Sequence, residues 1–288
     1  MKRMIEDTVL FDIGDALREK HNTDRRYQDN EMAQAVRDIQ SGDDSLAIGL
    51  IQRDLTEVNI PKGTTSIGEH AFSNCKNLTN ITIPDSVTNI GAYAFQGCSS
   101  LTEINLPDSI TSINGYAFYY CTSLKEFTIP DKVTSLTYYT FGNSGIEKIN
   151  FGSGLKIMGF DSFRAMKITE LIIPNSVVEM GERAVYQCQS LFRIYLPNSL
   201  QKIADTNFYA CDKLQEVILE EGFNCSINLS RSTKYSRETI VSWFEALADR
   251  TGLEANKLII NKQSESLLSE EDLAIPVNKN WTIVFSVT

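Results

Sequence analysis

The sequence has little of what enzymes, nucleic-acid-binding proteins and membrane proteins usually need. It holds only 2 histidines in 288 residues, His21 and His70, and it contains no glycine-rich phosphate loop, His-Glu-x-x-His motif or nucleophile elbow. Lys and Arg number 27 against 37 for Asp and Glu, and the net charge of −10 argues against nucleic acid or an anionic membrane as the main partner, since both need a basic face. No run approaches the roughly 20 apolar residues of a membrane-spanning helix. We therefore expect a protein that is not an enzyme, with no cofactor, no metal, no nucleic-acid partner and no membrane insertion.

The N-terminus also lacks the apolar segment of a secretory signal. After Met1, Lys2 and Arg3 the chain soon meets Glu6 and Asp7, where a signal peptide would place an apolar run. As written, this predicts a protein of the cytoplasm or of a virion or prophage particle. If a leader was removed, the same sequence fits an extracellular or cell-surface location. The 42% hydrophobic content predicts a packed core in either case.

What the sequence has in abundance is repetition. One short motif recurs eight times, with successive copies starting 23, 23, 23, 22, 22, 23 and 23 residues apart. The copies are Val58-Asn59-Ile60-Pro61, Ile81-Thr82-Ile83-Pro84, Ile104-Asn105-Leu106-Pro107, Phe127-Thr128-Ile129-Pro130, Ile149-Asn150-Phe151-Gly152, Leu171-Ile172-Ile173-Pro174, Ile194-Tyr195-Leu196-Pro197 and Val217-Ile218-Leu219-Glu220. A period this short and regular predicts a solenoid, in which each coil buries its apolar edge against its neighbours.

Columns of equivalent residues predict how each coil is built. The run that ends in Pro alternates apolar and polar residues like a strand. A stretch such as Gly91 to Cys98 predicts one short helical turn that closes the coil. Five copies carry Cys fourteen residues after the Pro: Cys75, Cys98, Cys121, Cys188 and Cys211. Because their spacing is the repeat period and not a ligand spacing, we expect reduced, buried thiols and no metal site. Cys225 lies outside this column.

Residues 101–121, Leu-Thr-Glu-Ile-Asn-Leu-Pro-Asp-Ser-Ile-Thr-Ser-Ile-Asn-Gly-Tyr-Ala-Phe-Tyr-Tyr-Cys, resemble the repeat of BspA-like bacterial leucine-rich repeat proteins. The resemblance covers about residues 55–222. It implies a right-handed solenoid with a sheet on its concave face and a role in surface adhesion or ligand recognition. Gly152 in place of Pro, and Ser144 and Met166 in place of Cys, depart from the pattern, and we expect local irregularity in those coils.

The predicted fold class is thus an α/β solenoid, a leucine-rich repeat of about eight coils of 22–23 residues with a different segment at each end. Residues 1–44 are predicted to form a helical N-terminal module, residues 45–224 the solenoid, and residues 225–288 a small α+β C-terminal cap. Within the cap we expect a helix from Ser236 to about Arg250, strands at 257–261 and 281–287, and a short helix at 269–274 that Pro276 ends or kinks.

The two flanks also resemble segments of phage and prophage tail-associated proteins, on residues 13–20, 31–36 and 268–282. They are interpreted either as caps on the open ends of the solenoid or as docking modules for other tail or surface proteins.

Outward strand positions form the candidate ligand-binding strip, because strand residues alternate faces. Its residues are Glu103, Asn105, Glu126, Thr128, Lys148, Asn150, Ile172, Tyr195 and Ile218. The last three form an apolar strip that either binds a partner or packs against the C-terminal cap. An alternative aromatic stripe consists of Tyr93, Tyr116 and Tyr139, which either bind a ligand or pack coil on coil.

These patterns favour non-catalytic recognition of a protein or glycan at a cell surface, by an adhesin-like or phage or prophage tail-associated protein. A secreted adhesin whose leader is absent is one alternative. A structural spacer that holds its termini apart and has no ligand of its own is the other.

Overall fold

A computed structural model describes residues 55–60, 62–231 and 234–287 of the chain. The predicted helical module at 1–44, the following residues 45–54 and Pro61 lie outside the described residues. The chain divides into two compact units, Met1–Gly154 and Leu155–Thr288, and each is described by itself. This division falls inside the repeat, and the domain boundaries expected from the sequence remain predictions.

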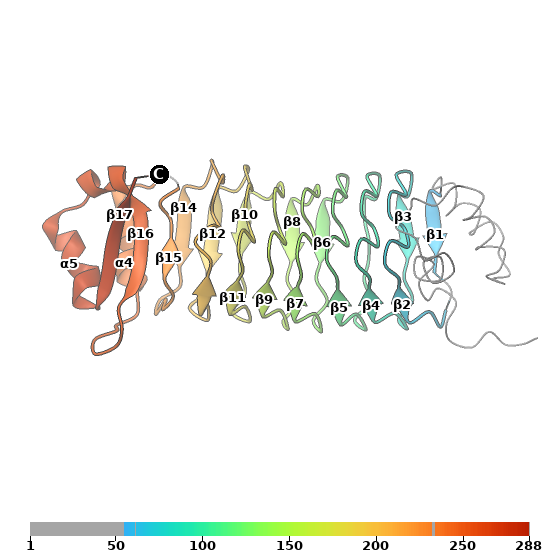
Figure 1. The fold of residues 1–288 in the computed structure, drawn as a ribbon, viewed down its shortest axis with the longest axis horizontal. Coiled ribbons are helices and arrows are strands. Elements are labelled where there is room, and N and C mark those ends of the chain that lie inside the picture. The colour runs from blue at the N-terminus through green and yellow to red at the C-terminus, as the bar shows by residue number, and fades with distance from the viewer. Residues whose placement is uncertain (1–54, 61, 232–233, 288) are drawn as a thin grey trace, which may run out of the picture. The chain divides into compact units, whose positions relative to one another are not determined.

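In the first unit each coil runs nearly parallel to the next, and strands of successive coils pair in parallel (Figure 1). β1 (Glu57–Asn59) pairs with β3 (Asn80–Thr82), and β6 (Glu126–Thr128) pairs with β8 (Lys148–Asn150). In β1, β3 and β6 the central residue is buried and the residues on either side of it are exposed, because successive side chains of a strand point to opposite faces.

A second parallel ladder, not predicted from the sequence, runs along the same unit. It consists of β2 (Ser66–Ile67), β4 (Asn89–Ile90), β5 (Ser112–Ile113) and β7 (Ser135–Leu136). Each of these strands has two residues, of which the second is buried. Strands this short have too little alternation to be recognised in a single sequence.

The first ladder is interrupted at the third copy of the motif, where no strand is assigned to residues 103–105. The nearby Thr102 N donates to Thr79 O at 3.4 Å, a long hydrogen bond. Ile104 is nevertheless buried between exposed Glu103 and Asn105, so the alternation of faces persists without the regular ladder.

The second unit repeats this plan. β10 (Glu170–Ile172), β12 (Arg193–Leu196) and β14 (Glu216–Leu219) form one parallel sheet. β9 (Ile157–Met158), β11 (Glu179–Met180) and β13 (Lys202–Ile203) form the other ladder. The eight-coil repeat predicted from the sequence is therefore confirmed in the described residues.

The helical turn predicted for each coil is wrong: the chain there makes consecutive tight turns. In one coil Tyr93 and Gly97 have φ of 59° and 70°, and in the next Tyr116 and Tyr120 have φ of 58° and 59°. Two left-handed residues four apart cannot lie in a right-handed helix. Alternate N–H groups bond to the next coil, as where Phe95 N donates to Ala117 O at 2.8 Å, and those between them bond three residues back, as where Gln96 N donates to Tyr93 O at 3.1 Å.

The core consists of stacked columns. Phe72, Phe95, Phe118 and Phe141 stack with ring centroids 5.3 to 5.6 Å apart. All six cysteines are free and buried, so the burial expected for the column is confirmed. In the column, Cys98 Sγ donates to Phe72 O and Cys121 Sγ to Phe95 O, each at 3.1 Å.

The C-terminal cap combines helices with strands, as predicted, and its strands form a parallel sheet. The sheet contains β15 (Ile227–Asn228), β16 (Asn256–Asn261) and β17 (Trp281–Ser286). The other elements are α4 (Arg237–Ala246), the 3₁₀ helix η1 (Lys262–Leu267) and α5 (Glu270–Asn278).

Two helix ends differ from the expectation. α4 stops at Ala246 and not near Arg250, because Gly222 and Phe223 N–H groups bond to Ala246 O and Ala248 N donates to Phe223 O. α5 runs past Pro276 to Asn278, because the proline lies in the last turn and removes only its own N–H donor. A capping box of Ser269 and Asp272 begins this helix.

Candidate functional site

In the first unit, four of the predicted site residues interact with each other on β6 and β8. Lys148 Nζ lies 2.5 Å from Glu126 Oε1, and Asn150 Nδ2 donates to the same oxygen at 3.0 Å and to Thr128 Oγ1 at 3.2 Å. The pKa of Glu126 is lowered, mainly by the Lys148 hydrogen bond and then by that of Asn150. These groups already satisfy one another, so a ligand would have to displace existing hydrogen bonds.

Glu103 and Asn105 are brought to the same face but do not join this cluster. Both are exposed, and neither side chain hydrogen-bonds to another described residue. The six polar residues of the strip therefore fall into two sets. Four of them hydrogen-bond to one another, and the side chains of Glu103 and Asn105 bond to no other described residue.

In the second unit the polar positions beside the strip form an ion-pair network that the sequence analysis did not predict. Arg193 donates to Glu216 Oε2 at 2.5 Å and to Glu170 Oε1 at 3.3 Å. These two hydrogen bonds, that from Glu216 first, raise the pKa of Arg193. The signal in the sequence was an alternation of sign, Glu-Arg-Glu, at one position of three successive coils.

Beside this network, Ile172, Tyr195 and Ile218 lie in register on β10, β12 and β14. We call these three residues the apolar strip. Ile172 is 60% exposed and Ile218 is 38% exposed, although both lie in the same unit as the cap. Of the two interpretations that the sequence left open, packing against the C-terminal cap does not account for Ile172, whereas Ile218 is partly covered and lies on β14, which α4 of the cap contacts.

The aromatic stripe of the first unit packs coil on coil. His70, Tyr93, Tyr116 and Tyr139 stack nearly parallel, with ring centroids 4.6, 4.7 and 4.8 Å apart. Burial, followed by the nearby Tyr138 and Glu69, raises the pKa of the Tyr93 hydroxyl. Because neighbours cover both faces of Tyr93 and Tyr116, this row presents ring edges and polar tips.

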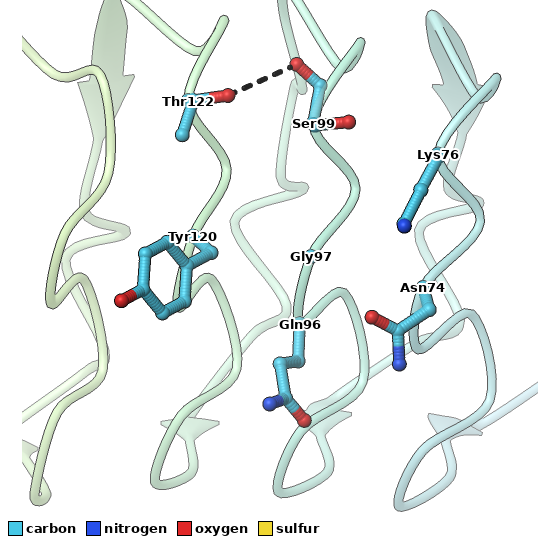
Figure 2. A pocket seen from close by; sticks show the side chains of 7 residues that line it. All are labelled: Asn74, Lys76, Gln96, Gly97, Ser99, Tyr120 and Thr122. Carbon is cyan, nitrogen blue, oxygen red and sulfur yellow. Dashed lines mark hydrogen bonds between the residues drawn. The ribbon is translucent and has the colours of Figure 1, made fainter.

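A groove that sequence reasoning missed lies beside this row, on the turns of three coils (Figure 2). Its volume is 440 Å³, within the usual range of ligand pockets. The residues that line it are Asn74, Lys76, Gln96, Gly97, Ser99, Tyr120 and Thr122. The side chain of Tyr120 also contacts Tyr119, with ring centroids 4.4 Å apart at a steep angle.

Two other kinds of site were sought in the part of the chain that the structure describes. No three His, Cys, Asp or Glu side chains there gather closely enough to hold a metal ion. No helix among the described residues is long and apolar enough to span a membrane.

Comparison with known families gives one extensive match. Residues 51–167 and 135–234 match the BspA type leucine-rich repeat region, in 6 copies. No curated protein matches the chain significantly.

Several solved structures are similar. A leucine-rich repeat protein of T. pallidum is 27% identical with a TM-score of 0.43, over 60% of this chain and 73% of that one. A leucine-rich cell surface protein of Faecalibacterium prausnitzii is 22% identical with a TM-score of 0.46, over 81% and 80%. The pneumococcal vaccine antigen PcpA is 16% identical with a TM-score of 0.38, over 82% and 69%. None of these matches supports the resemblance of the flanks to phage tail-associated proteins.

Proposed function

Because the chain belongs to the family of proteins with BspA type leucine-rich repeat regions, we propose that it is a non-catalytic recognition protein that binds a protein ligand at a cell surface through the apolar strip. Repeats of this family are typical of binding proteins, not of enzymes. The observation that carries the proposal is the exposure of Ile172 on a sheet face, at 60%, where a soluble coil would ordinarily place a polar residue.

The surroundings of the strip have the composition of a protein interface. An apolar centre of Ile172, Tyr195 and Ile218 lies beside the charged network of Arg193 with Glu170 and Glu216. Protein interfaces commonly combine an apolar core, often with Tyr and Arg, and a polar rim. The two ion pairs hold the Arg193 side chain in place, which reduces the conformational entropy that it would lose on binding a partner.

This proposal covers an adhesin and a tail-associated protein equally, because both would use the same strip on a cell surface. A glycan ligand on this strip is less well supported, since aliphatic side chains offer it no hydrogen bonds. The structural spacer is the alternative with no ligand at all.

The test is cell binding by the labelled full chain and by the double variant Ile172→Lys/Ile218→Lys. We expect saturable binding of the wild-type chain to bacterial or epithelial cells, measured by flow cytometry, and its loss after the cells are treated with protease. The double variant should bind at least tenfold more weakly, because it places two charges at the centre of the interface.

Ile157→Lys is the matched control, because Ile157 is also 38% exposed but lies on β9, outside the strip. It should bind like the wild type. Equal binding by the double variant would overturn the assignment of the strip. Absence of binding to every cell type tested would favour the spacer.

A further inference from the structure

The groove on the turns of the first unit is a second surface, distinct in residues and chemistry from the apolar strip. We propose that it is a carbohydrate-binding site that takes an acidic sugar residue, one that carries a carboxylate. The proposal does not depend on the function assigned to the apolar strip, since it uses none of the same residues.

The groove exists because one coil has no side chain at a position where its neighbours have one. Asn74, Gly97 and Tyr120 occupy the same position, thirteen residues after the Pro, in three successive copies. Figure 2 shows Gly97 between Asn74 on one side and Tyr120 on the other. A Cβ at Gly97 would lie 2.6 Å from Asn74 Oδ1, so a larger residue at this position would have to displace the end of the Asn74 side chain and would narrow the groove. The backbones of the two outer coils are two coil spacings, roughly 10 Å, apart.

One wall supplies an aromatic surface. Tyr120 is 48% exposed, and its ring contacts Tyr119, which in turn contacts Tyr116 and Tyr139 of the aromatic row. Its backbone has a φ of 59°, which bulky residues seldom adopt. A ring held in this way attracts polarised C–H groups through the negative charge of its face, and the C–H face of a sugar ring carries such groups.

Two of the other lining residues supply polar groups that bond to no other described residue. The side chains of Lys76 and Gln96 make no hydrogen bond or ion pair with the other described residues. Gln96 offers both a donor and an acceptor, which suits sugar hydroxyls. In Figure 2 the Lys76 ammonium points along the wall toward Asn74 and the groove.

The charge of the groove indicates an acidic ligand. The chain carries 37 acidic residues against 27 basic ones, yet the lining contains Lys76 and no Asp or Glu. A carboxylate in the groove would therefore meet a cation without meeting a like charge from the lining. An ammonium that lacks an internal partner forms a charge-assisted hydrogen bond to such a group without breaking an existing pair.

The test is calorimetric titration of the full chain with three probes: a hyaluronan tetrasaccharide, which carries hexuronic acids, 3′-sialyllactose, and neutral lactose. We expect at least one acidic probe to bind and lactose to bind at least tenfold more weakly. Preference for the hexuronate probe would indicate a polysaccharide source, and preference for the sialylated probe would indicate a cell-surface glycan.

Three variants locate the binding. Lys76→Gln removes the cation, Tyr120→Ala removes the aromatic wall, and Gly97→Asn fills the floor. Asn can adopt the backbone conformation there, because Asn74 and Asn143 occupy the same position of other coils with φ of 59° and 55°, although its Cβ requires the Asn74 amide to move aside. Each variant should raise the Kd of the acidic probe at least tenfold, while Lys76→Gln should leave lactose unaffected.

Two matched controls lie outside the groove. Tyr138→Ala removes a tyrosine that is 54% exposed, and Lys132→Gln removes an exposed lysine. Both should bind like the wild type. Failure of all acidic probes to bind at millimolar concentration would overturn the proposal, as would binding that the three groove variants leave unchanged. Neither result would affect the cell-binding test of the apolar strip.

Discussion

At the scale of single residues, the aromatic row shows how strain and packing are balanced. Tyr93, Tyr116 and Tyr139 have φ of 59°, 58° and 55°, a conformation that bulky residues rarely adopt. The ring of Tyr116 stacks on Tyr93 and on Tyr139 of the two neighbouring coils, with centroids 4.7 and 4.8 Å apart. Aromatic pairs contribute on the order of 1 kcal/mol beyond their burial, which offsets part of the backbone cost.

The cysteine column gives a prediction on pH. Burial raises the pKa of the Cys121 and Cys211 thiols to about 12, from 9.0. A raised folded-state pKa means that the thiols contribute stability fully below pH 9, and that this contribution is lost as pH rises from 9 toward 12. We therefore expect the urea midpoint at 25 °C to fall between pH 8.5 and pH 11.

Thiol titration provides the second readout of the same prediction. At pH 8 the native thiols should react slowly with a disulfide reagent, since only thiolates attack and these are scarce in the core. All six should react in denaturant. Cys225, whose pKa burial raises to about 11, should be the first to react as pH rises. Rapid reaction of the whole column in the native state would contradict the packing described above.

At the scale of elements, the β6–β8 pair permits a matched comparison of two exposed glutamates. Glu126 accepts hydrogen bonds from Lys148 and Asn150, whereas Glu103 bonds to no other described side chain. Glu126→Lys should therefore lower the Tm more than Glu103→Lys, because it removes these bonds and places like charges on neighbouring strands.

Differential scanning calorimetry of the two single variants measures this difference. Glu126→Lys combined with Lys148→Glu is the control, and it should recover part of the loss by restoring opposite charges. Equal Tm values for Glu103→Lys and Glu126→Lys would mean that the pair on β6 and β8 has no net effect, as many exposed ion pairs have none.

The sequence predicted the elements that follow from its period and missed those that depend on bonds between coils. The apolar columns placed Phe118 and Cys121 correctly in the core, because equivalent residues of a solenoid share one environment. The prediction of a helical turn between Gly91 and Cys98 is wrong, since the spacing of Gly91, Ala94 and Phe95 fits a helical turn as well as the tight turns that the structure has there. Hydrogen bonds to the next coil decide the backbone there, and a single repeat does not show them.

At the scale of the whole molecule, the sequence predicted some properties of the candidate surfaces, and only the structure shows the others. Alternation along strands predicted that Ile172 and Ile218 point outward, but only the structure shows that the cap leaves them exposed. The groove was missed because it arises from Gly97 lying between residues of two other coils. The available signal was the change from Asn to Gly to Tyr at one repeat position.

The cap and the last coils of the second unit are joined by Trp243 of α4. Its side chain is fully buried, and Nε1 donates to Val217 O of β14 at 2.6 Å. β14 pairs on one side with β12, so its other edge would offer unpaired backbone groups without the helix. The end of a solenoid needs such a cover for both stability and solubility.

Trp243→Ala should therefore lower the free energy of unfolding by about 3–5 kcal/mol, the usual cost of emptying a large buried aromatic site. It should also increase self-association, measured by light scattering after size-exclusion chromatography, because the edge of β14 becomes accessible. Trp243→Phe is the control: it keeps most of the apolar volume, loses the hydrogen bond to Val217 and should cost less. Urea unfolding measures both variants. A loss below about 1 kcal/mol for Trp243→Ala, with no self-association, would mean that the coils are stable without this contact and that α4 is not a cap.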